Sequence, residues 1–380
     1  MASGDRHRLT FRGPNEPYYG YGRTYVSLRE NLEICVDLVD DAPVCVDVKQ
    51  PNMVKGWHRG QYRSCLTMWE TSVLPDKFAM HSKQFDQIIV PCQHNKELFS
   101  EYNPNTVVVP LGVDMSMWKP GRRPKNEQIT FLAGGSHWLR KGLDKVVEAF
   151  GKWGNPDARL ILKCTPETIG GVPKIVYPNV QVIAKWMSVE DEVELYRSAD
   201  CFVAASRGEG WGLMPLQAMC LGVPTIMTAT TGHNEFAAYA TWIVETKSVP
   251  VSLDRFYKTG NWDEPDIESL IAGFQHVADN LDKAWKDAKA FLPEVRRFDW
   301  GNSTKRLLEV LPMDYTAEIG PWELAGEVHV EVVVSRRVVA DIGKYHVDLA
   351  PGITHSVPIN VRDTIRDAGY LVENDGNVQR

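Results

Sequence analysis

A glycine-rich loop at residues 206–212 carries the side chains with the clearest chemical potential. It follows an apolar stretch, Cys201–Ala204, and precedes a helical stretch that begins near Pro215. Glycine lets the backbone turn sharply and approach a ligand closely, and proline suits the first turn of a helix. A helix that begins after a parallel strand directs free N–H groups and the positive end of its dipole at a ligand. The pattern therefore predicts a binding site for a nucleoside diphosphate.

Two polar side chains accompany this loop, Glu209 on the loop itself and Gln217 on the helix, eight residues later. Both side chains can face one bound molecule, and both carry oxygen atoms that accept hydrogen bonds from sugar hydroxyls. The alternative interpretations are a solvated loop carboxylate for Glu209 and a plain surface amide for Gln217. The pair therefore favours a ligand that has hydroxyl groups as well as phosphates.

Short apolar strands alternate with helical stretches on both sides of this loop. Strands are predicted at residues 34–39, 44–48, 64–69, 87–91, 106–109, 129–133, 159–163, 180–183, 201–204 and 225–227, and helices at residues 93–101, 142–153, 189–197 and 215–221. Such alternation implies parallel sheets covered by helices on both faces. A stretch rich in Pro, Gly, Arg and Lys at residues 119–126 interrupts it. We therefore predict an α/β protein with domains at residues 1–118 and 119–312, and a small β-rich module at residues 325–380.

The composition restricts the class of protein. The 380 residues are 43% hydrophobic and 24% charged, with a formal net charge of -7. This acidic balance disfavours nonspecific nucleic-acid binding, which requires a basic surface. The sequence has no apolar run of membrane-spanning length and no charged-then-apolar leader, so we expect a cytoplasmic protein. The seven cysteines lack paired spacing and are expected to be buried free thiols.

Residues 206–219 resemble the donor domain of the retaining GT-B glycosyltransferases of group 1, whose motif reads Glu-Gly-aromatic-Gly-Leu-x-x-x-Glu-Ala-Met. The resemblance implies two facing Rossmann-like domains with a cleft between them. It also implies that Glu209 binds the hydroxyls of the transferred sugar and that Gln217 binds the ribose. Because Gln217 replaces a glutamate, its hydrogen bonds lose the assistance of a charge. The donor-binding residues implied between the two are Gly210, Trp211, Gly212 and Leu213.

Residues 131–144 resemble the first strand, loop and helix of that donor domain, where a cationic pair meets the diphosphate. Arg140 and Lys141 are the candidates. Breaking the sugar–phosphate bond leaves negative charge on the departing diphosphate, and fixed cations lower this barrier without a metal. Cations at a helix start oppose the dipole unless an anion joins them; the alternative is two solvated charges. Relatives place an arginine where this chain has Gly135, so either Arg140 or Arg207 substitutes for it.

The first half of the chain is matched less closely. Gly20 and Gly22, before a helical stretch at residues 24–31, resemble the glycine loop that relatives fold over the diphosphate, or form a structural turn. Glu70 ends a strand where many relatives carry a histidine. It either orients and partly deprotonates an acceptor hydroxyl or makes a cap or a salt bridge. Trp186 follows a strand where relatives present backbone to the nucleotide base, and it either stacks on the base or is a buried aromatic.

The resemblance covers about the first 310 residues. Residues 304–311 correspond to the last helix, which in relatives crosses back onto the first domain. Residues 325–380 look similar to short modules in bacteriophage proteins; they either recruit an acceptor or another subunit, or extend the packing. The clustered carboxylates Asp37, Asp40 and Asp41 have no further ligand at metal spacing, and the cationic pair supplies the charge that a metal would supply. We therefore expect no metal and no other cofactor.

Together these features predict a retaining, metal-independent hexosyltransferase. It would move a sugar from a nucleoside diphosphate donor to a hydroxyl of a glycan, lipid, small molecule or protein, with no nucleic-acid partner and no membrane span. The predicted catalytic residues are Glu209, Arg140, Lys141 and Glu70. One alternative is a nucleotide-sugar epimerase or hydrolase, because a fold does not determine a function. Another is a nucleotide-sugar-binding module without activity, which Gln217 and Gly135 favour.

Overall fold

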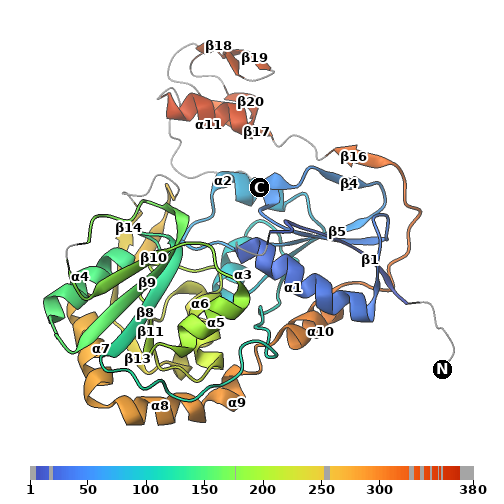
Figure 1. The fold of residues 1–380 in the computed structure, drawn as a ribbon. Helices are drawn as coiled ribbons and strands as arrows, with labels where there is room; N and C mark the ends of the chain where they lie inside the picture. The colour runs from blue at the N-terminus through green and yellow to red at the C-terminus, as the bar shows by residue number, and fades with distance from the viewer. Residues whose placement is uncertain are drawn as a thin grey trace. The chain divides into compact units, whose positions relative to one another are not determined.

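The computed structural model describes residues 6–16, 20–175, 177–251, 257–324, 329–333, 338–342, 345–349, 351 and 354–368. The chain divides into two compact units. The first contains Met1–Met53 and Gly60–Gly320, and the second contains Val54–Arg59 and Pro321–Arg380. The first unit holds two parallel sheets (Figure 1) and all the residues that the sequence predicts to act on a ligand.

The first sheet has six described strands in the order β2-β1-β3-β5-β6-β7, and all neighbours are parallel. They are β1 (Arg8–Arg12), β2 (Asp37–Leu38), β3 (Val44–Val48), β5 (Tyr62–Leu66), β6 (Gln87–Val90) and β7 (Thr106–Val108). The helices are α1 (Gly20–Cys35), η1 (Pro51–Met53), α2 (Asp76–Ser82) and α3 (Gln93–Ser100). Helix α1 packs on β2 and β3, and α3 packs on β6 and β7. Parallel neighbours need crossover connections, so this half is a Rossmann-like domain.

The sequence prediction is wrong around α1. The strand expected at residues 34–39 is a helix over its first two residues, because α1 continues to Cys35 and only Asp37–Leu38 is extended. Ile34 is 77% exposed, so an apolar side chain here does not mark a buried strand. No strand is predicted at β1, whose buried Leu9 and Phe11 alternate with polar residues. Only its pairing with β2 and β3 makes it a strand inside the sheet.

The second sheet has the order β10-β9-β8-β11-β12-β13, again with parallel neighbours. Its described strands are β8 (Ile129–His137), β9 (Ala158–Ile169), β10 (Val180–Ala184), β11 (Cys201–Ala204), β12 (Thr225–Thr228) and β13 (Trp242–Val244). Its helices are α4 (Leu143–Trp153), α5 (Val189–Arg197), α6 (Leu213–Cys220), η2 (Thr231–Glu235), η3 (Ala237–Tyr239), α7 (Ile267–Asp279), α8 (Leu281–Ala290) and α9 (Leu292–Val295). The predictions of α5 and β11 are confirmed to the residue. This half is therefore a second Rossmann-like domain.

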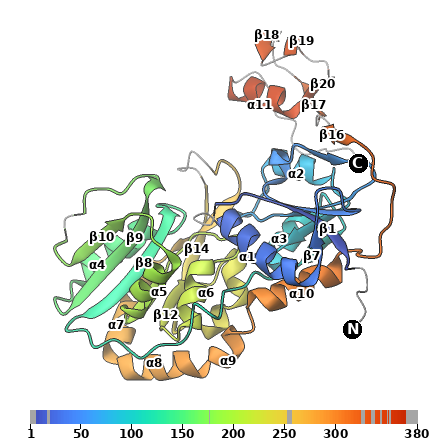
Figure 2. The ribbon, with the colours of Figure 1, turned by 45° about the vertical axis from the view of Figure 1, so that its right-hand side comes forward.

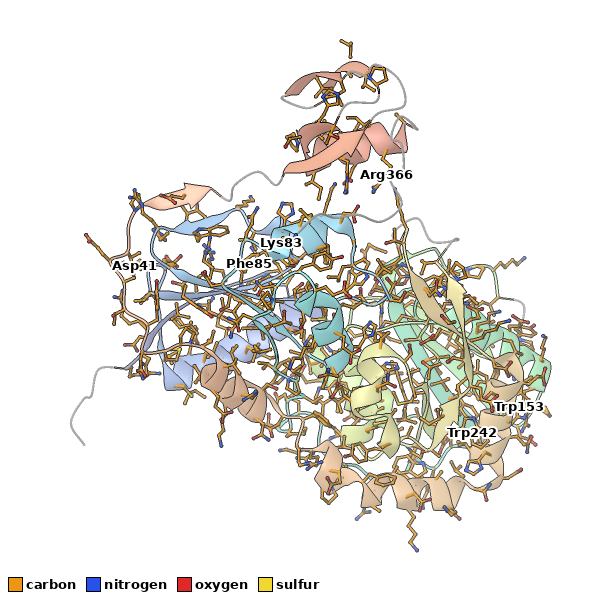
Figure 3. All side chains as sticks on the ribbon, turned by 180° about the vertical axis from the view of Figure 1, so that it is seen from behind. Asp41, Lys83, Phe85, Trp153, Trp242 and Arg366 are labelled. Carbon is orange, nitrogen blue, oxygen red and sulfur yellow. The ribbon has the colours of Figure 1, made fainter. Side chains whose placement is uncertain are left out.

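Alternate residues of strand β8 fill two different hydrophobic cores. Phe131 packs with Trp153 of α4 and Phe274 of α7, at centroid distances of 5.8 and 5.0 Å. Its neighbour Leu132 belongs to a core that contains Leu216 of α6. Successive side chains of a strand point to opposite faces, so α4 and α7 cover one face of the sheet and α6 covers the other. Figure 3 labels Trp153 on the flank that α4 and α7 form.

The last helix of the first unit, α10 (Trp300–Val310), follows the second domain but lies against the first. It packs beside α1 (Figure 2). Leu307 of α10 shares a core with Leu28 and Leu32 of α1, and Gln87 Nε2 of the first sheet donates a hydrogen bond to Val310 O at 3.0 Å. The end of this unit therefore ties its two domains together.

The remaining strands lie outside the two large sheets. After β13, strands β14 (Thr246–Pro250) and β15 (Asn261–Pro265) form an antiparallel pair. In the second unit β4 (Gly56–His58) pairs with β16 (Trp322–Leu324), β17 (His329–Val333) with β20 (Thr354–Pro358), and β18 (Val338–Ile342) with β19 (Tyr345–Leu349), all antiparallel. Helix α11 (Ile359–Asp367) packs on β17 and β20. Of the β-rich module predicted at residues 325–380, residues 369–380 lie outside the described residues.

Candidate functional site

A cleft of about 280 Å³ lies between the two Rossmann-like domains, beyond the carboxyl ends of β8 and β11. The predicted site residues that line it are Gly20, Glu70, Gly135, Arg140, Lys141, Glu209, Gly210, Trp211, Gly212, Leu213 and Gln217. Gly22, Trp186 and Arg207 are described by the structure and do not line it. Residues from β8, the loop after β11, α1 and the loop after β5 thus meet at the place where open α/β sheets bind ligands.

Three charged side chains of the predicted site form one buried cluster. Glu209 Oε2 lies 2.9 Å from Arg140 Nη1, and Glu209 Oε1 lies 2.6 Å from Lys141 Nζ. Ser206 Oγ donates a hydrogen bond to Glu209 Oε1 at 2.7 Å. The charged side chains are only 6% to 13% exposed. One carboxylate is therefore shared by two cations in a largely dry environment.

Burial and charge have opposite effects on the pKa values in this cluster. Burial alone raises the pKa of Glu209, but the cations of Arg140 and Lys141 outweigh it and hold that pKa well below its ordinary value. Burial lowers the pKa of Lys141 in spite of the nearby Glu209 carboxylate. Burial also opposes the charge of Arg140, but Glu209 outweighs it and raises the arginine pKa. The carboxylate and the guanidinium are consequently both charged at neutral pH.

Gly135 lies within β8, where the resemblance places an arginine, and its surroundings leave no room for a side chain. Its φ of +152° is unusual for an L side chain, and a Cβ added here would lie 2.5 Å from Lys141 Cγ. Any side chain at this position would displace Lys141, whose amine holds Glu209. Arg140 reaches the same carboxylate from the following loop. The structure therefore favours Arg140 as the second cation of the cleft.

The prediction that Arg207 substitutes for this cation is wrong. Arg207 is 4% exposed and forms two hydrogen bonds of 2.7 Å to the carboxylate of Asp144. Its Nη2 also bonds Glu264 at 3.0 Å, and its Nη1 donates to Leu139 O. Two carboxylates neutralise this guanidinium outside the cleft, so its role is to hold the loop before α6 against α4 and β15.

The glycine loop predicted at Gly20 and Gly22 is also wrong at these two residues, because α1 begins at Gly20. Gly20 does line the cleft. A Cβ on Gly22, however, would lie 1.8 Å from the backbone oxygen of Glu16, so Gly22 packs on the preceding chain. Residues 17–19 of the same motif lie outside the described residues.

Gln217 of helix α6 lines the cleft, and so do Trp211 in the loop before this helix and Arg140 in the loop before α4. Gly212 begins the helix with a φ of +108°, and Gln217 is 3% exposed. Within the described part of the chain, Trp211 Nε1 and Arg140 Nε are buried without a hydrogen-bond partner. An unsatisfied buried donor costs roughly 1–3 kcal/mol. Acceptor oxygens of a ligand would remove that cost.

Trp186 is half-buried in the loop after β10, an edge strand of the second sheet. Its stacking on a nucleotide base stays a prediction.

The turn after β12 supplies two further polar residues near the site, Thr231 and His233. Thr231 Oγ1 accepts a hydrogen bond from Glu209 N at 2.7 Å. His233 is fully buried, with Nδ1 3.0 Å from Thr228 O, and burial lowers its pKa to about 4. A Cβ on Gly212 would lie 2.4 Å from its ring. The turn after β12 therefore supports both Glu209 and the start of α6, which only the parallel order of the strands brings together.

A second ion-paired group crosses the cleft. Glu192 of α5 accepts from Lys163 Nζ of β9 at 2.7 Å and from Arg23 Nη2 of α1 at 3.0 Å. Arg23 belongs to the first domain, and the other two belong to the second. This group therefore links the two domains at the cleft.

The carboxylates near the start of the chain are engaged in ion pairs. Asp41, labelled in Figure 3, lies 2.7 Å from Arg8, and Asp37 lies 3.5 Å from Arg6. Among the described residues, no group of three or more His, Cys, Asp or Glu side chains has the arrangement of a metal site. That the protein uses no metal stays a prediction.

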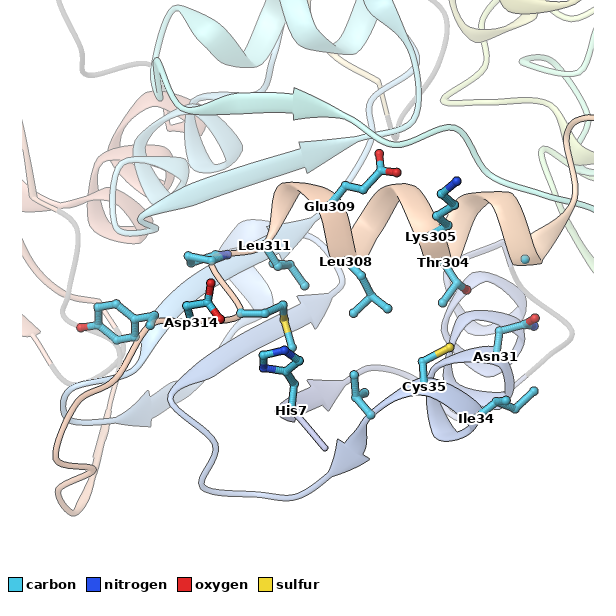
Figure 4. A pocket seen from close by; sticks show the side chains of 15 residues that line it. His7, Asn31, Ile34, Cys35, Thr304, Lys305, Leu308, Glu309, Leu311 and Asp314 are labelled. Carbon is cyan, nitrogen blue, oxygen red and sulfur yellow. The ribbon is translucent and has the colours of Figure 1, made fainter. Parts of the chain in front are cut away.

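A larger cavity of about 870 Å³ lies between α1 and α10, away from the charged cluster. Figure 4 shows Leu308 of α10 and Leu311, directly after this helix, on the opposite side of the cavity from His7 and Cys35. None of the predicted site residues lines this cavity.

The described helices include none that is long and apolar enough to cross a membrane.

The sequence of the second domain matches a known family. Residues 127–253 match the family described as "Glycosyl transferases group 1". A putative glycosyltransferase 41 of Sulfolobus islandicus filamentous virus (isolate Iceland/Hveragerdi) is 27% identical over 212 residues, which are 54% of this chain and 58% of that protein. Mannosylfructose-phosphate synthase of Agrobacterium fabrum (strain C58 / ATCC 33970) is 30% identical over 122 residues, 28% of this chain and 27% of that protein. The chain thus spans less than two thirds of the length of these relatives.

Solved structures agree with the fold. Anabaena Alr3699/HepE in complex with UDP-glucose superposes with a TM-score of 0.57 at 12% identity, over 80% of this chain and 98% of that chain. Sucrose-phosphate synthase from Thermosynechococcus elongatus gives a TM-score of 0.53 at 16% identity, over 71% and 73%. The predicted fold class is confirmed: the chain has the GT-B arrangement of two Rossmann-like domains, and its second domain is similar to the group 1 glycosyl transferases.

Proposed function

We propose that this protein is a retaining glycosyltransferase that moves a sugar from a nucleoside diphosphate to an acceptor hydroxyl. The observation that carries the proposal is the buried cluster of Glu209, in the loop before α6, with Arg140 and Lys141, directly before α4. Two adjacent cations at a helix N-terminus suit a diphosphate, and a carboxylate beside them suits the attached sugar. The UDP-glucose complex of Alr3699/HepE supports a nucleotide sugar as the donor class.

The proposed reaction needs stabilisation of a leaving group. The bond between the anomeric carbon and the diphosphate oxygen breaks, and its electron pair stays on the diphosphate. The acceptor oxygen bonds the anomeric carbon on the same face of the sugar, and its proton passes to the departing phosphate oxygen. Arg140 and Lys141 stabilise the charge that develops there. The same two cations provide the charge that a metal would otherwise supply.

Glu209 changes partners in this proposal. Its two carboxylate oxygens lie 2.9 and 2.6 Å from the two cations. A bound diphosphate would replace the carboxylate as the partner of these cations. The carboxylate then accepts hydrogen bonds from the sugar hydroxyls, and Gln217 holds the ribose from the buried side of α6. Bonds to an ionised acceptor are about twice as strong as neutral ones, so Glu209 provides the main hold on the sugar. Glu70 lies across the cleft and receives the acceptor hydroxyl.

The test begins with thermal-shift measurements against UDP-, GDP- and ADP-sugars, because a ligand at a hundred times its dissociation constant adds roughly 2.7 kcal/mol of stability. The donor that stabilises the protein is then incubated with hydroxyl acceptors, and NMR reports the anomeric configuration of the product. Retention supports the proposal. Inversion refutes the retaining class, and donor consumption that is independent of any acceptor indicates an epimerase or a hydrolase.

One observation favours a second candidate, a nucleotide-sugar-binding module without activity. Gln217 stands where the resemblance places a glutamate, and Gly135 stands where it places an arginine. Calorimetric binding of a donor with no turnover on any acceptor would support this candidate. A Glu209→Ala variant that loses turnover but keeps donor affinity within about tenfold would support the enzyme.

A further inference from the structure

The hairpin β14–β15 of the second domain docks on the loop that carries Glu70 in the first. Ser72 N donates a hydrogen bond to Asn261 O at 3.0 Å, and Asn261 N donates to Ser72 Oγ at 2.8 Å. Gly260 approaches so closely that an added Cβ would lie 2.9 Å from Val73 N. This contact brings residues almost two hundred positions apart together and connects the hairpin directly to the acceptor side of the cleft.

Tyr257, four residues before β15 begins, is the hairpin residue that reaches the active-site loop. It is 4% exposed, and its ring lies 5.1 Å from the Trp69 ring and 5.5 Å from the His137 ring. Burial raises the pKa of both Tyr257 and Glu70, and the interaction between the two side chains lowers the pKa of Glu70 and raises that of Tyr257 further. When Glu70 is ionised it has no proton to donate, so the tyrosine is then the only possible donor between the two side chains. The aromatic packing therefore aims a hydrogen-bond donor at Glu70.

The charges around Glu70 make its ionisation state sensitive to this interaction. Burial raises the pKa of Glu70, with the cations of Arg140 and Lys141 opposing and the Glu209 carboxylate adding to the rise. Burial raises the pKa of the Tyr21 hydroxyl of α1, and the Glu70 charge adds to that rise. The two cations also pair with Glu209, whereas the interaction with Tyr257 lowers the pKa of Glu70 from the other domain.

We infer that Tyr257 is a positioning residue that keeps Glu70 ionised and directed at the acceptor hydroxyl, and that the β14–β15 hairpin is the element that delivers it. The inference rests on the proposed function, because it assigns Glu70 to the acceptor. Before the reaction Glu70 accepts a hydrogen bond from the acceptor hydroxyl; as the new glycosidic bond forms, the same proton turns to the departing phosphate oxygen, so Glu70 gains no proton. Tyr257 holds the other side of the carboxylate and exchanges nothing.

The test compares Tyr257→Phe with wild type in steady-state sugar transfer over a range of pH. The variant keeps the ring and its packing and loses only the hydroxyl. Because that hydroxyl stabilises the charged carboxylate, its loss should move the acid limb of kcat/KM to higher pH by about one unit, a tenfold change in the ionisation constant. The KM for the acceptor should rise several-fold, and the KM for the donor should stay within about twofold, as expected for a residue that touches neither nucleotide nor diphosphate.

Tyr25→Phe is the matched control. Tyr25 is a buried tyrosine stacked on Phe11 at 5.3 Å in the first domain, and it does not line the cleft. Loss of the Tyr25 hydroxyl should leave the KM for the donor, the KM for the acceptor and the pH profile unchanged. A Glu70→Gln background gives the second measurement: with no carboxylate to position, Tyr257→Phe should change nothing further.

The inference is overturned if Tyr257→Phe leaves the acid limb and the acceptor KM at their wild-type values. It is also overturned if the effects of Tyr257→Phe and Glu70→Gln add independently, because two residues that act through one contact cannot be additive. Failure of the proposed function looks different: wild type itself would then transfer no sugar to any hydroxyl acceptor.

Discussion

Glu209→Gln should make the protein less stable and, at the same time, increase its affinity for a nucleoside diphosphate. The carboxylate neutralises Arg140 and Lys141 at 2.9 and 2.6 Å. An amide keeps the shape of the side chain but leaves two buried cations without a counter-charge. A diphosphate would supply that charge without first having to displace the carboxylate. Sugar transfer should fall, because the ionised acceptor for the sugar hydroxyls is lost.

The magnitude follows from the burial of the pair. Removing one partner of a buried ion pair costs on the order of 3–5 kcal/mol. For a domain of 150–250 residues each kcal/mol shifts Tm by about 2–4 °C, and this unit is larger, so a decrease of about 6–10 °C is expected. If the diphosphate binds the variant about tenfold more tightly than wild type, it stabilises the variant by roughly 1.4 kcal/mol more. At the same ligand concentration, this raises the ligand-induced increase in Tm by about 3 °C.

The assay is thermal unfolding with and without UDP, GDP or ADP, with calorimetry for the dissociation constant. Glu264→Gln is the matched control, because Glu264 also faces two cations, Arg207 and Lys145, but outside the cleft. It should lower Tm without any gain in nucleotide affinity. If Glu209→Gln binds the nucleoside diphosphate no more tightly than wild type, the cations of the cluster do not meet a diphosphate and the assignment of this site fails.

Three further predictions concern other parts of the site. Gln217→Glu should strengthen donor binding by about 1 kcal/mol or less, since the free energy gained from a charge-assisted bond to the ribose narrowly exceeds the added cost of desolvating the carboxylate. Gln217→Ala should weaken the binding of the nucleoside diphosphate and of the intact donor equally. If calorimetry finds the binding of both ligands unchanged in Gln217→Ala, residue 217 does not touch the nucleotide. His233 has a pKa lowered to about 4 by burial, so its contribution to stability is complete above pH about 6.5 and is lost as the pH falls toward 4. Between pH 7 and pH 5 that loss is about 2 kcal/mol, and equal acid sensitivity of unfolding in wild type and His233→Gln would contradict it. Incubation with EDTA should leave sugar transfer unchanged, and an activity that EDTA abolishes and Mg²⁺ or Mn²⁺ restores would show that the two cations are not sufficient.

Local pattern was sufficient where a segment's own residues determine its structure. Helix α5 begins with a serine cap, Ser188, whose side chain accepts from Asp191 N, and β11 is a short apolar run buried on both faces. Both elements were predicted with the bounds that the structure has. The motif at Glu209 was readable for the same reason, because its glycines and the helix that follows are adjacent in the chain.

Long-range pairing determined the elements that the sequence did not reveal. Strand β1 has only two apolar residues, Leu9 and Phe11, and becomes a strand because β2 and β3 supply its hydrogen-bond partners. Tyr257 carries no motif at all, and it reaches Glu70 only because the β14–β15 hairpin docks on the other domain.

The charged residues show the same division. The sequence by itself determined which cations and carboxylates are available, and it marked Arg140, Lys141 and Arg207 alike as candidates near a helix start. Only the tertiary structure decided that Glu209 takes the first two in the cleft while Asp144 and Glu264 neutralise the third outside it. The physical reason is that the energy of an ion pair depends on distance and on burial, and neither quantity exists until strands and helices far apart in the chain have packed together.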